Sequence, residues 1–223
     1  MIPLLQDRRL IIFDWDGTLM DSISTICRCL AHAFAHAGLE DRGEAQYKEI
    51  IGLGLNDALA VLAPEADEKL RAHILEGYRH CFFSTPAAAM PLFPGVEETL
   101  SRLVDAGYQL AVATGKARRG LDKILTEYPR VEALVGASRC ADETRSKPDP
   151  LMLEELLDHY QLPPKAAVMV GDTVHDMEMA VAAGVLPIGV LCGVHNESRL
   201  TQAGAQLCLP DPRFLLGEKE KPQ

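Results

Sequence analysis

The chain has 223 residues, of which 48% are hydrophobic, so it can bury the core of one large domain or of one domain with a modest insert. It carries 22 lysines and arginines against 32 aspartates and glutamates, which gives a formal net charge of -10. That charge opposes non-specific attraction to nucleic acid or to an anionic membrane, so we expect neither as a partner. An anionic substrate would have to be attracted by lysines and backbone amides placed locally.

The apolar runs are too short for a membrane-spanning helix, and residues 1–13 lack the basic start and small-residue cleavage site of a signal peptide. We therefore expect a cytoplasmic protein. The six cysteines form no CxxC pair and have no spacing that suits zinc. We expect them to be reduced and mostly buried.

Short apolar segments alternate with helix-length stretches through most of the chain. Strands are expected at residues 10–13, 109–114, 166–171 and 186–191, with a weaker one at 133–136, and helices at 96–106, 151–160 and 174–183. This alternation is typical of βα crossovers. The fold class predicted is α/β, a Rossmann-like parallel sheet with helices on both faces.

Residues 21–90 break the alternation. They contain four helical patterns, at 22–38, 44–51, 56–63 and 67–83, and no convincing strand. We therefore expect an all-helical cap at 21–90, inserted into a catalytic core made of 1–20 and 91–223, with a return hinge near 86–94. The tail, 217–223, is expected to fray.

Polar residues follow the ends of the predicted strands. Asp14 and Asp16 follow the first strand, Thr114 ends another, and Asp172 follows a third, while Lys147 precedes a helix. Ligands of open α/β sheets bind beyond the carboxyl ends of the strands. Each residue alone has an ordinary explanation, such as a turn, a helix cap or a solvated loop. Two carboxylates directly after a buried strand are costly without a cation or other partners.

Together these residues suit phosphoryl transfer through a carboxylate. The carboxylates can hold a hard, oxygen-seeking cation such as Mg²⁺, whereas the threonine, the Gly115 amide and the lysine suit a phosphate dianion. Asp14 can attack phosphorus in line and hold it as an aspartyl phosphate. Asp16 can protonate the leaving oxygen and later activate water.

Four motifs carry a family resemblance. They are Phe13-Asp14-Trp15-Asp16-Gly17-Thr18-Leu19, Ala113-Thr114-Gly115-Lys116, Lys147-Pro148-Asp149-Pro150 and Val170-Gly171-Asp172-Thr173-Val174-His175-Asp176. In this order and spacing the set resembles the haloacid-dehalogenase-like hydrolase superfamily over residues 10–191. The helical insert after the first motif is similar to the mobile cap of the phosphoglycolate-phosphatase-like branch.

The resemblance implies a role for each charged residue of the motifs. Asp14 would be the nucleophile and a ligand of Mg²⁺, and Asp16 the general acid/base, with its backbone carbonyl on the metal. Asp172 would be a further metal ligand, and Asp176 would support the metal shell or its waters. Lys147 would bind the phosphoryl group and hold Asp14.

The remaining motif residues would shape the phosphate site. Thr114 would bind the phosphoryl group, and the backbone amides of Trp15, Asp16 and Gly115 would join it. Thr18 would orient the first loop and is counted with the phosphate-binding residues. Lys116 stands where many relatives carry an asparagine followed by a lysine, which makes the Thr-Gly pair less diagnostic.

The function predicted is Mg²⁺-dependent hydrolysis of a small phosphorylated metabolite, like phosphoglycolate, a sugar phosphate or a nucleotide, by a monomer or small homo-oligomer. A phosphomutase or pyrophosphatase of the same superfamily stays open, as does a regulator that binds a metabolite without catalysis. The glycine-containing loop 52–56 either helps to choose the substrate or is a plain turn. His32 and His36, four apart on one helix, could bind zinc only with a third ligand, and none is evident.

Overall fold

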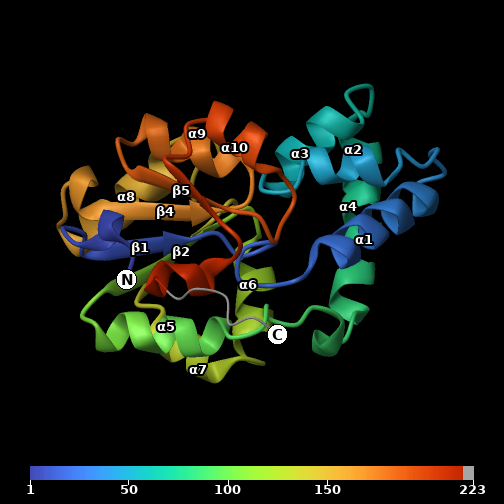
Figure 1. The fold of residues 1–223 in the computed structure, drawn as a ribbon. Coiled ribbons are helices and arrows are strands. Elements are labelled where there is room, and N and C mark those ends of the chain that lie inside the picture. Colours follow the sequence, from blue (N-terminus) through green and yellow to red (C-terminus); the bar gives the residue numbers. More distant parts are fainter. Residues whose placement is uncertain (218–223) are drawn as a thin grey trace.

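The computed structural model describes residues 1–217 and contains one six-stranded parallel sheet with the strand order β3-β2-β1-β4-β5-β6 (Figure 1). The strands are β1 (Leu10–Phe13), β2 (Gln109–Thr114), β3 (Ala137–Cys140), β4 (Ala167–Gly171), β5 (Leu186–Val190) and β6 (Leu207–Leu209). Each neighbouring pair is parallel. The order is that of a doubly wound α/β sheet, and it confirms the predicted fold class.

Helices cover both faces of the sheet. Helices α5 (Val96–Asp105), α6 (Arg118–Leu125) and α7 (Pro129–Leu134) lie on one face, and α8 (Leu151–Tyr160), α9 (Val174–Ala182) and α10 (Glu197–Gln202) on the other. Strand β1 is buried on both sides because its alternate residues enter different cores. Ile11 and Phe13 pack in the first core, and Leu10 and Ile12 in the second. The continuous apolar run of β1 follows from this double burial.

The third strand was predicted in the wrong place. Residues 133–136 include the end of helix α7 and the two irregular residues after it, and strand β3 begins at Ala137. A short apolar run can belong to a strand or to a buried helix, and the sequence period cannot distinguish them. Strand β6 was not predicted. Most of the tail predicted to fray lies outside the described residues.

The inserted segment forms an all-helical cap beside the carboxyl ends of the strands (Figure 1). Its helices are α1 (Ile23–His36), α2 (Glu44–Glu49), α3 (Leu55–Leu62) and α4 (Glu68–Ser84). They enclose a hydrophobic core of their own, which includes Leu30, Phe34, Tyr47 and Leu59.

The two connections between cap and core run side by side. Met20 and Leu92 form an antiparallel bridge, and the Asp21 amide donates to the Pro91 carbonyl at 2.8 Å. This pairing supports our proposal that the cap spans 21–90 and is hinged at this bridge.

Two cysteines depart from the expectation that all six are reduced. Cys29 on α1 and Cys81 on α4 form a disulfide across the cap, with their Cα atoms 5.3 Å apart. The prediction of reduced thiols was therefore wrong for this pair. The two residues are 52 positions apart, and only the packing of α1 against α4 brings them together. Within residues 1–217, no helix combines the length and apolar character needed to cross a membrane.

Candidate active site

The site lies where three neighbouring strands end. Asp14 follows β1, Thr114 is the last residue of β2, and Asp172 follows β4. Because β1 lies between β2 and β4, the three strand ends meet at one edge of the sheet. All three side chains are buried. The parallel register therefore brings together residues that are far apart in the chain.

A buried lysine joins two of the predicted carboxylates. The Lys147 Nζ atom lies 2.5 Å from Asp14 Oδ1 and 2.6 Å from Asp176 Oδ1. One candidate ligand atom from each of Asp14, Asp172 and Asp176 lies within 4.8 Å of the others. The structure thus places three carboxylates and one ammonium group in a single buried cluster.

Burial sets the protonation behaviour of this cluster. It raises the pKa of Asp14 to about 7, although the ammonium group of Lys147 acts in the opposite direction. Burial, followed by the charges of Asp14 and Asp176, also raises the pKa of Asp172. For Lys147, burial alone would lower the pKa, but the Asp14 and Asp176 carboxylates hold it above its ordinary value. The lysine therefore stays charged.

The outer contacts of the carboxylates fix their orientation. The Thr18 hydroxyl and the Val194 amide donate to the two oxygens of Asp172 at 2.9 and 2.8 Å. The amide and hydroxyl of Thr173 donate to Asp176 Oδ2 at 3.0 and 2.7 Å, in a capping box that begins α9. Asp176 thus takes part in the capping box of α9, whose N-cap is Thr173, and also pairs with Lys147.

The cluster suits a hard divalent cation. Asp14 Oδ2 is buried and has no hydrogen-bond partner. Burying several carboxylates with only one lysine costs folding free energy, and a cation that binds oxygen would balance their negative charge. Asp14, Asp172 and Asp176 are the side chains that could hold it.

Asp16 lines the cavity beside this cluster and has two partners that sequence reasoning missed. The Ser22 hydroxyl donates to Asp16 Oδ1 at 2.5 Å, and Lys116 Nζ lies 2.8 Å from the same oxygen. Both contacts engage Oδ1, so Oδ2 has neither. Lys116 follows the Thr-Gly pair of the second motif, which was the only signal for it. Nothing in the sequence pointed to Ser22.

The other residues predicted to bind phosphate lie at the same edge of the sheet, and their side chains make different contacts. Thr114 is fully buried, and its hydroxyl accepts the Lys116 amide at 3.2 Å. Trp15 is buried, and its ring nitrogen faces Met20 Sδ at 3.3 Å, so only its backbone is available at the site. Thr18 uses its hydroxyl on Asp172, so in this structure it orients a carboxylate.

The cap loop predicted at 52–56 lies directly over the site. A Cβ atom built on Gly115 would lie 2.5 Å from the Leu53 carbonyl oxygen and 2.6 Å from that of Gly52, so only glycine permits this approach. The Gly54 amide donates to Ser146 Oγ at 2.6 Å, next to Lys147 in the sequence. The loop therefore packs closely on Gly115 and Ser146 at the edge of the site and is not a plain turn between two helices.

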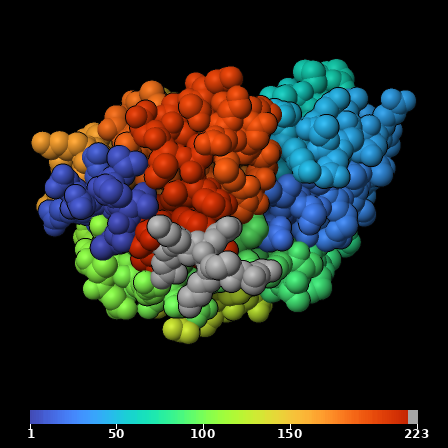
Figure 2. Space-filling view, in the orientation of Figure 1, coloured from blue at the N-terminus to red at the C-terminus, as the bar shows by residue number. Residues whose placement is uncertain are grey.

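A second contact holds the cap beside the core. Arg199 on α10 forms a two-pronged ion pair with Glu49 on α2, with both N–O distances 2.7 Å. The Glu49 carbonyl also lies 3.2 Å from His175 Nε2. Figure 2 shows the blue-to-cyan cap packed against the orange-red segment that includes this part of the core.

Cap and core together enclose a cavity of about 440 Å³ that Asp14 and Asp16 line. Its cap wall is largely apolar and aromatic and includes Ile26, Leu30, Tyr78, Phe82 and Phe83. Lys116 and Arg119 line its core side, and Lys116 Nζ lies 4.7 Å from the centre of the Phe82 ring. The volume is in the usual range for small-molecule sites, about 300–1,000 Å³.

Comparison with known proteins agrees with this geometry. A family model for haloacid dehalogenase-like hydrolases matches residues 11–190. The phosphoglycolate phosphatase of Vibrio vulnificus strain CMCP6 is 29% identical over 218 residues, which cover 94% of this chain and 92% of the relative. A protein of Dickeya dadantii named probable phosphatase IndB is 34% identical over 205 residues, covering 89% and 87%.

Solved structures share the whole fold. A predicted phosphoglycolate phosphatase from Haemophilus somnus 129PT has a TM-score of 0.83 at 25% identity, covering 96% of this chain and 98% of that one. A hydrolase from Pseudomonas syringae has a TM-score of 0.82 at 22% identity, covering 95% and 97%.

The doubly wound sheet, the strand-end carboxylates and the inserted cap are those of a hydrolase with a Rossmann-like core and a helical cap. The chain belongs to the haloacid dehalogenase-like hydrolase family. Its relatives place it among the phosphatases of that family, in the phosphoglycolate-phosphatase-like branch.

Proposed function

We propose that this enzyme is a Mg²⁺-dependent phosphomonoester hydrolase that acts on a small phosphorylated metabolite through an aspartyl phosphate on Asp14. The observation that carries the proposal is the buried cluster itself. Asp14 has one oxygen on Lys147 and a second, buried oxygen without a partner, and two further carboxylates lie beside it. That second oxygen is available to a metal or to phosphorus.

In the first step, an oxygen of Asp14 attacks phosphorus, and the bond from phosphorus to the ester oxygen breaks. Asp16 donates a proton to the leaving oxygen, which departs as an alcohol. In the second step, Asp16 takes a proton from water, and the water oxygen attacks phosphorus. The bond between phosphorus and the Asp14 oxygen breaks, inorganic phosphate leaves, and the Asp14 carboxylate is regenerated.

Each residue of the site contributes to these steps. Lys147 orients Asp14, and its positive charge offsets part of the rise that burial causes in the pKa of Asp14. Ser22 and Lys116 hold Asp16 by Oδ1, which leaves Oδ2 to exchange the proton. Mg²⁺, held by Asp14, Asp172 and Asp176, would neutralise charge on the phosphoryl oxygens.

The size and lining of the cavity indicate which substrates could bind. The names of several relatives suggest phosphoglycolate. A volume of about 440 Å³ also has room for a sugar- or nucleotide-sized leaving group, and the aromatic wall formed by Tyr78, Phe82 and Phe83 offers a surface for an apolar plane. We therefore keep all three substrate types in the proposal.

The test is phosphate release from a panel of phosphorylated metabolites and from an aryl phosphate. We expect Asp14→Asn to abolish turnover, whereas Asp105→Asn, an exposed site on α5, should retain it. Chelation should silence the wild type, and added Mg²⁺ should restore it. Circular dichroism would establish that the variant is folded. Undiminished turnover by Asp14→Asn would refute the mechanism, and a phosphorylated isomer without free phosphate would indicate a mutase.

A further inference from the structure

A row of histidines lies on the surface of the cap, away from the catalytic cluster. Of the seven histidines in the chain, four lie along the seam between two cap helices. His32 and His36 are on α1, and His73 and His80 are on α4. All four are exposed. The proposed reaction uses none of them.

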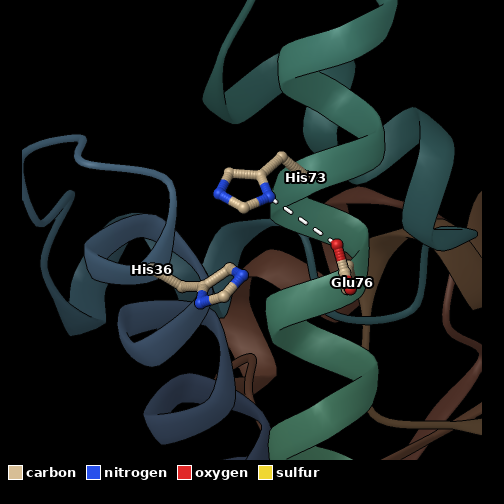
Figure 3. A group of neighbouring side chains, drawn as sticks. All are labelled: His36, His73 and Glu76. Carbon is tan, nitrogen blue, oxygen red and sulfur yellow. Dashed lines mark ion pairs between the residues drawn. The ribbon is translucent and has the colours of Figure 1, made fainter.

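Three side chains of this row converge on one space. The ring centres of His36 and His73 are 4.4 Å apart, and His73 Nδ1 lies 3.7 Å from Glu76 Oε2. Figure 3 shows His36 and His73 in the space between the two helices, and Glu76 on α4 with its carboxylate turned towards His73. One candidate ligand atom from each lies within 4.8 Å of the others. The possible partners of His36 therefore lie on α4, and His32, with which the sequence paired it, is not one of the three.

The backbones of α1 and α4 lie close together beneath these three side chains. A Cβ atom built on Gly77 of α4 would lie 3.0 Å from His36 Cβ and 3.1 Å from Ala33 Cα, so the missing side chain lets the helices approach. The Cys29–Cys81 disulfide joins the same two helices two turns away on α1. The three ligand positions are thus presented by a fixed pair of helices, and only the side chains need to move.

We propose that His36, His73 and Glu76 form a second metal site, specific for a divalent transition cation of the zinc type. Two imidazole nitrogens and one carboxylate oxygen are one of the sets of three protein ligands that bind zinc, with water in the fourth position. At bond lengths of about 2.0–2.1 Å, the ligand atoms must draw somewhat closer than they lie here, and exposed side chains can rotate to do so.

This site differs chemically from the catalytic one. The catalytic cluster offers only oxygen ligands, which suit Mg²⁺, whereas imidazole selects zinc, nickel, cobalt and copper. A cation bound by His36 on one helix and by His73 and Glu76 on the other would cross-link α1 to α4. It would therefore stabilise the cap against unfolding without entering the reaction.

The test is calorimetric titration of the full-length protein with zinc in excess Mg²⁺, which keeps the catalytic carboxylates occupied. The variants are His36→Ala and His73→Ala, and the matched control is His159→Ala, an exposed histidine on α8. We expect the first two to lose one zinc equivalent or at least about tenfold in affinity. The control should bind as the wild type does.

Two further readouts separate this site from other zinc sites. Cobalt should give a visible absorption band in the wild type and in His159→Ala that is absent in His73→Ala. Zinc should also raise the unfolding temperature of the wild type and of the control more than that of His73→Ala. Equal zinc stoichiometry and affinity in all four proteins would overturn the proposal, and such a result would leave the proposed hydrolysis at Asp14 unaffected.

Discussion

Lys147 offers a direct test of how the buried carboxylates of the candidate site are stabilised. Its side chain is fully buried and pairs with Asp14 and Asp176. Replacing it by methionine keeps a chain of similar length but removes the charge. Breaking a buried ion pair by deleting one partner costs about 3–5 kcal/mol, a large share of a typical stability of about 5–15 kcal/mol.

An unpaired buried aspartate can take up a proton, so the loss of stability cannot exceed the free energy of protonating it. That free energy depends on pH. An aspartate with an ordinary pKa of about 3.9 takes up a proton at a cost of about 6 kcal/mol at about pH 8, and of about 2 kcal/mol at about pH 5.5. Asp14, with a pKa raised to about 7, is already protonated at the lower pH in the wild type. Without Lys147 its pKa rises further, so the folded variant loses stability as pH increases. We therefore expect Lys147→Met to lose about 3–5 kcal/mol at the higher pH and less than about 2 kcal/mol at the lower.

The assay is urea unfolding followed by circular dichroism, in chelator, at both pH values. Lys165→Met, a change of an exposed lysine, is the control and should behave as the wild type. Mg²⁺ should recover part of the loss, since it also compensates the carboxylates. A Lys147→Met variant as stable as the wild type at the higher pH, or a loss of equal size at both, would show that the pairing does not stabilise the site as argued.

Three further predictions address the cap and the metal. The Glu49–Arg199 pair is about half exposed, so Glu49→Gln should weaken cap closure by at most about 1 kcal/mol. The variant should have a higher KM than the wild type at low salt, and the two KM values should become equal at high salt. Glu65→Gln, which breaks a pair within the cap, should leave KM unchanged. Burial raises the pKa of Tyr47 to about 12 from 10.0, so the wild type should lose stability relative to Tyr47→Phe as pH rises from 10 towards 12, and parallel pH profiles would contradict this. Inorganic phosphate should bind in calorimetry only when Mg²⁺ is present, and equal binding in chelator would count against the proposed charge balance.

The sequence was most informative where one buried strand fixed both where a site residue lies and which residue type follows the strand. The run before Asp14 had to be buried on both faces, and parallel strands end at one edge, so the sequence alone predicts that Asp14 and Asp172 lie close together. Contacts between distant elements were different. Ser22 reaches Asp16 only because α1 begins next to the first loop, and Cys29 meets Cys81 only because α1 packs against α4. Neither pairing leaves a periodic signal in the chain.

Charge balance explains why cation and substrate should depend on each other. The substrate is an anion, and it approaches a chain of net charge -10. The two lysines at the site are already paired, Lys147 with Asp14 and Asp176, and Lys116 with Asp16. They orient the carboxylates but leave little net positive charge for a phosphate dianion. If the proposed function is right, the divalent cation supplies much of that charge, and we expect Mg²⁺ to be needed for the phosphoryl group to bind as well as for it to react.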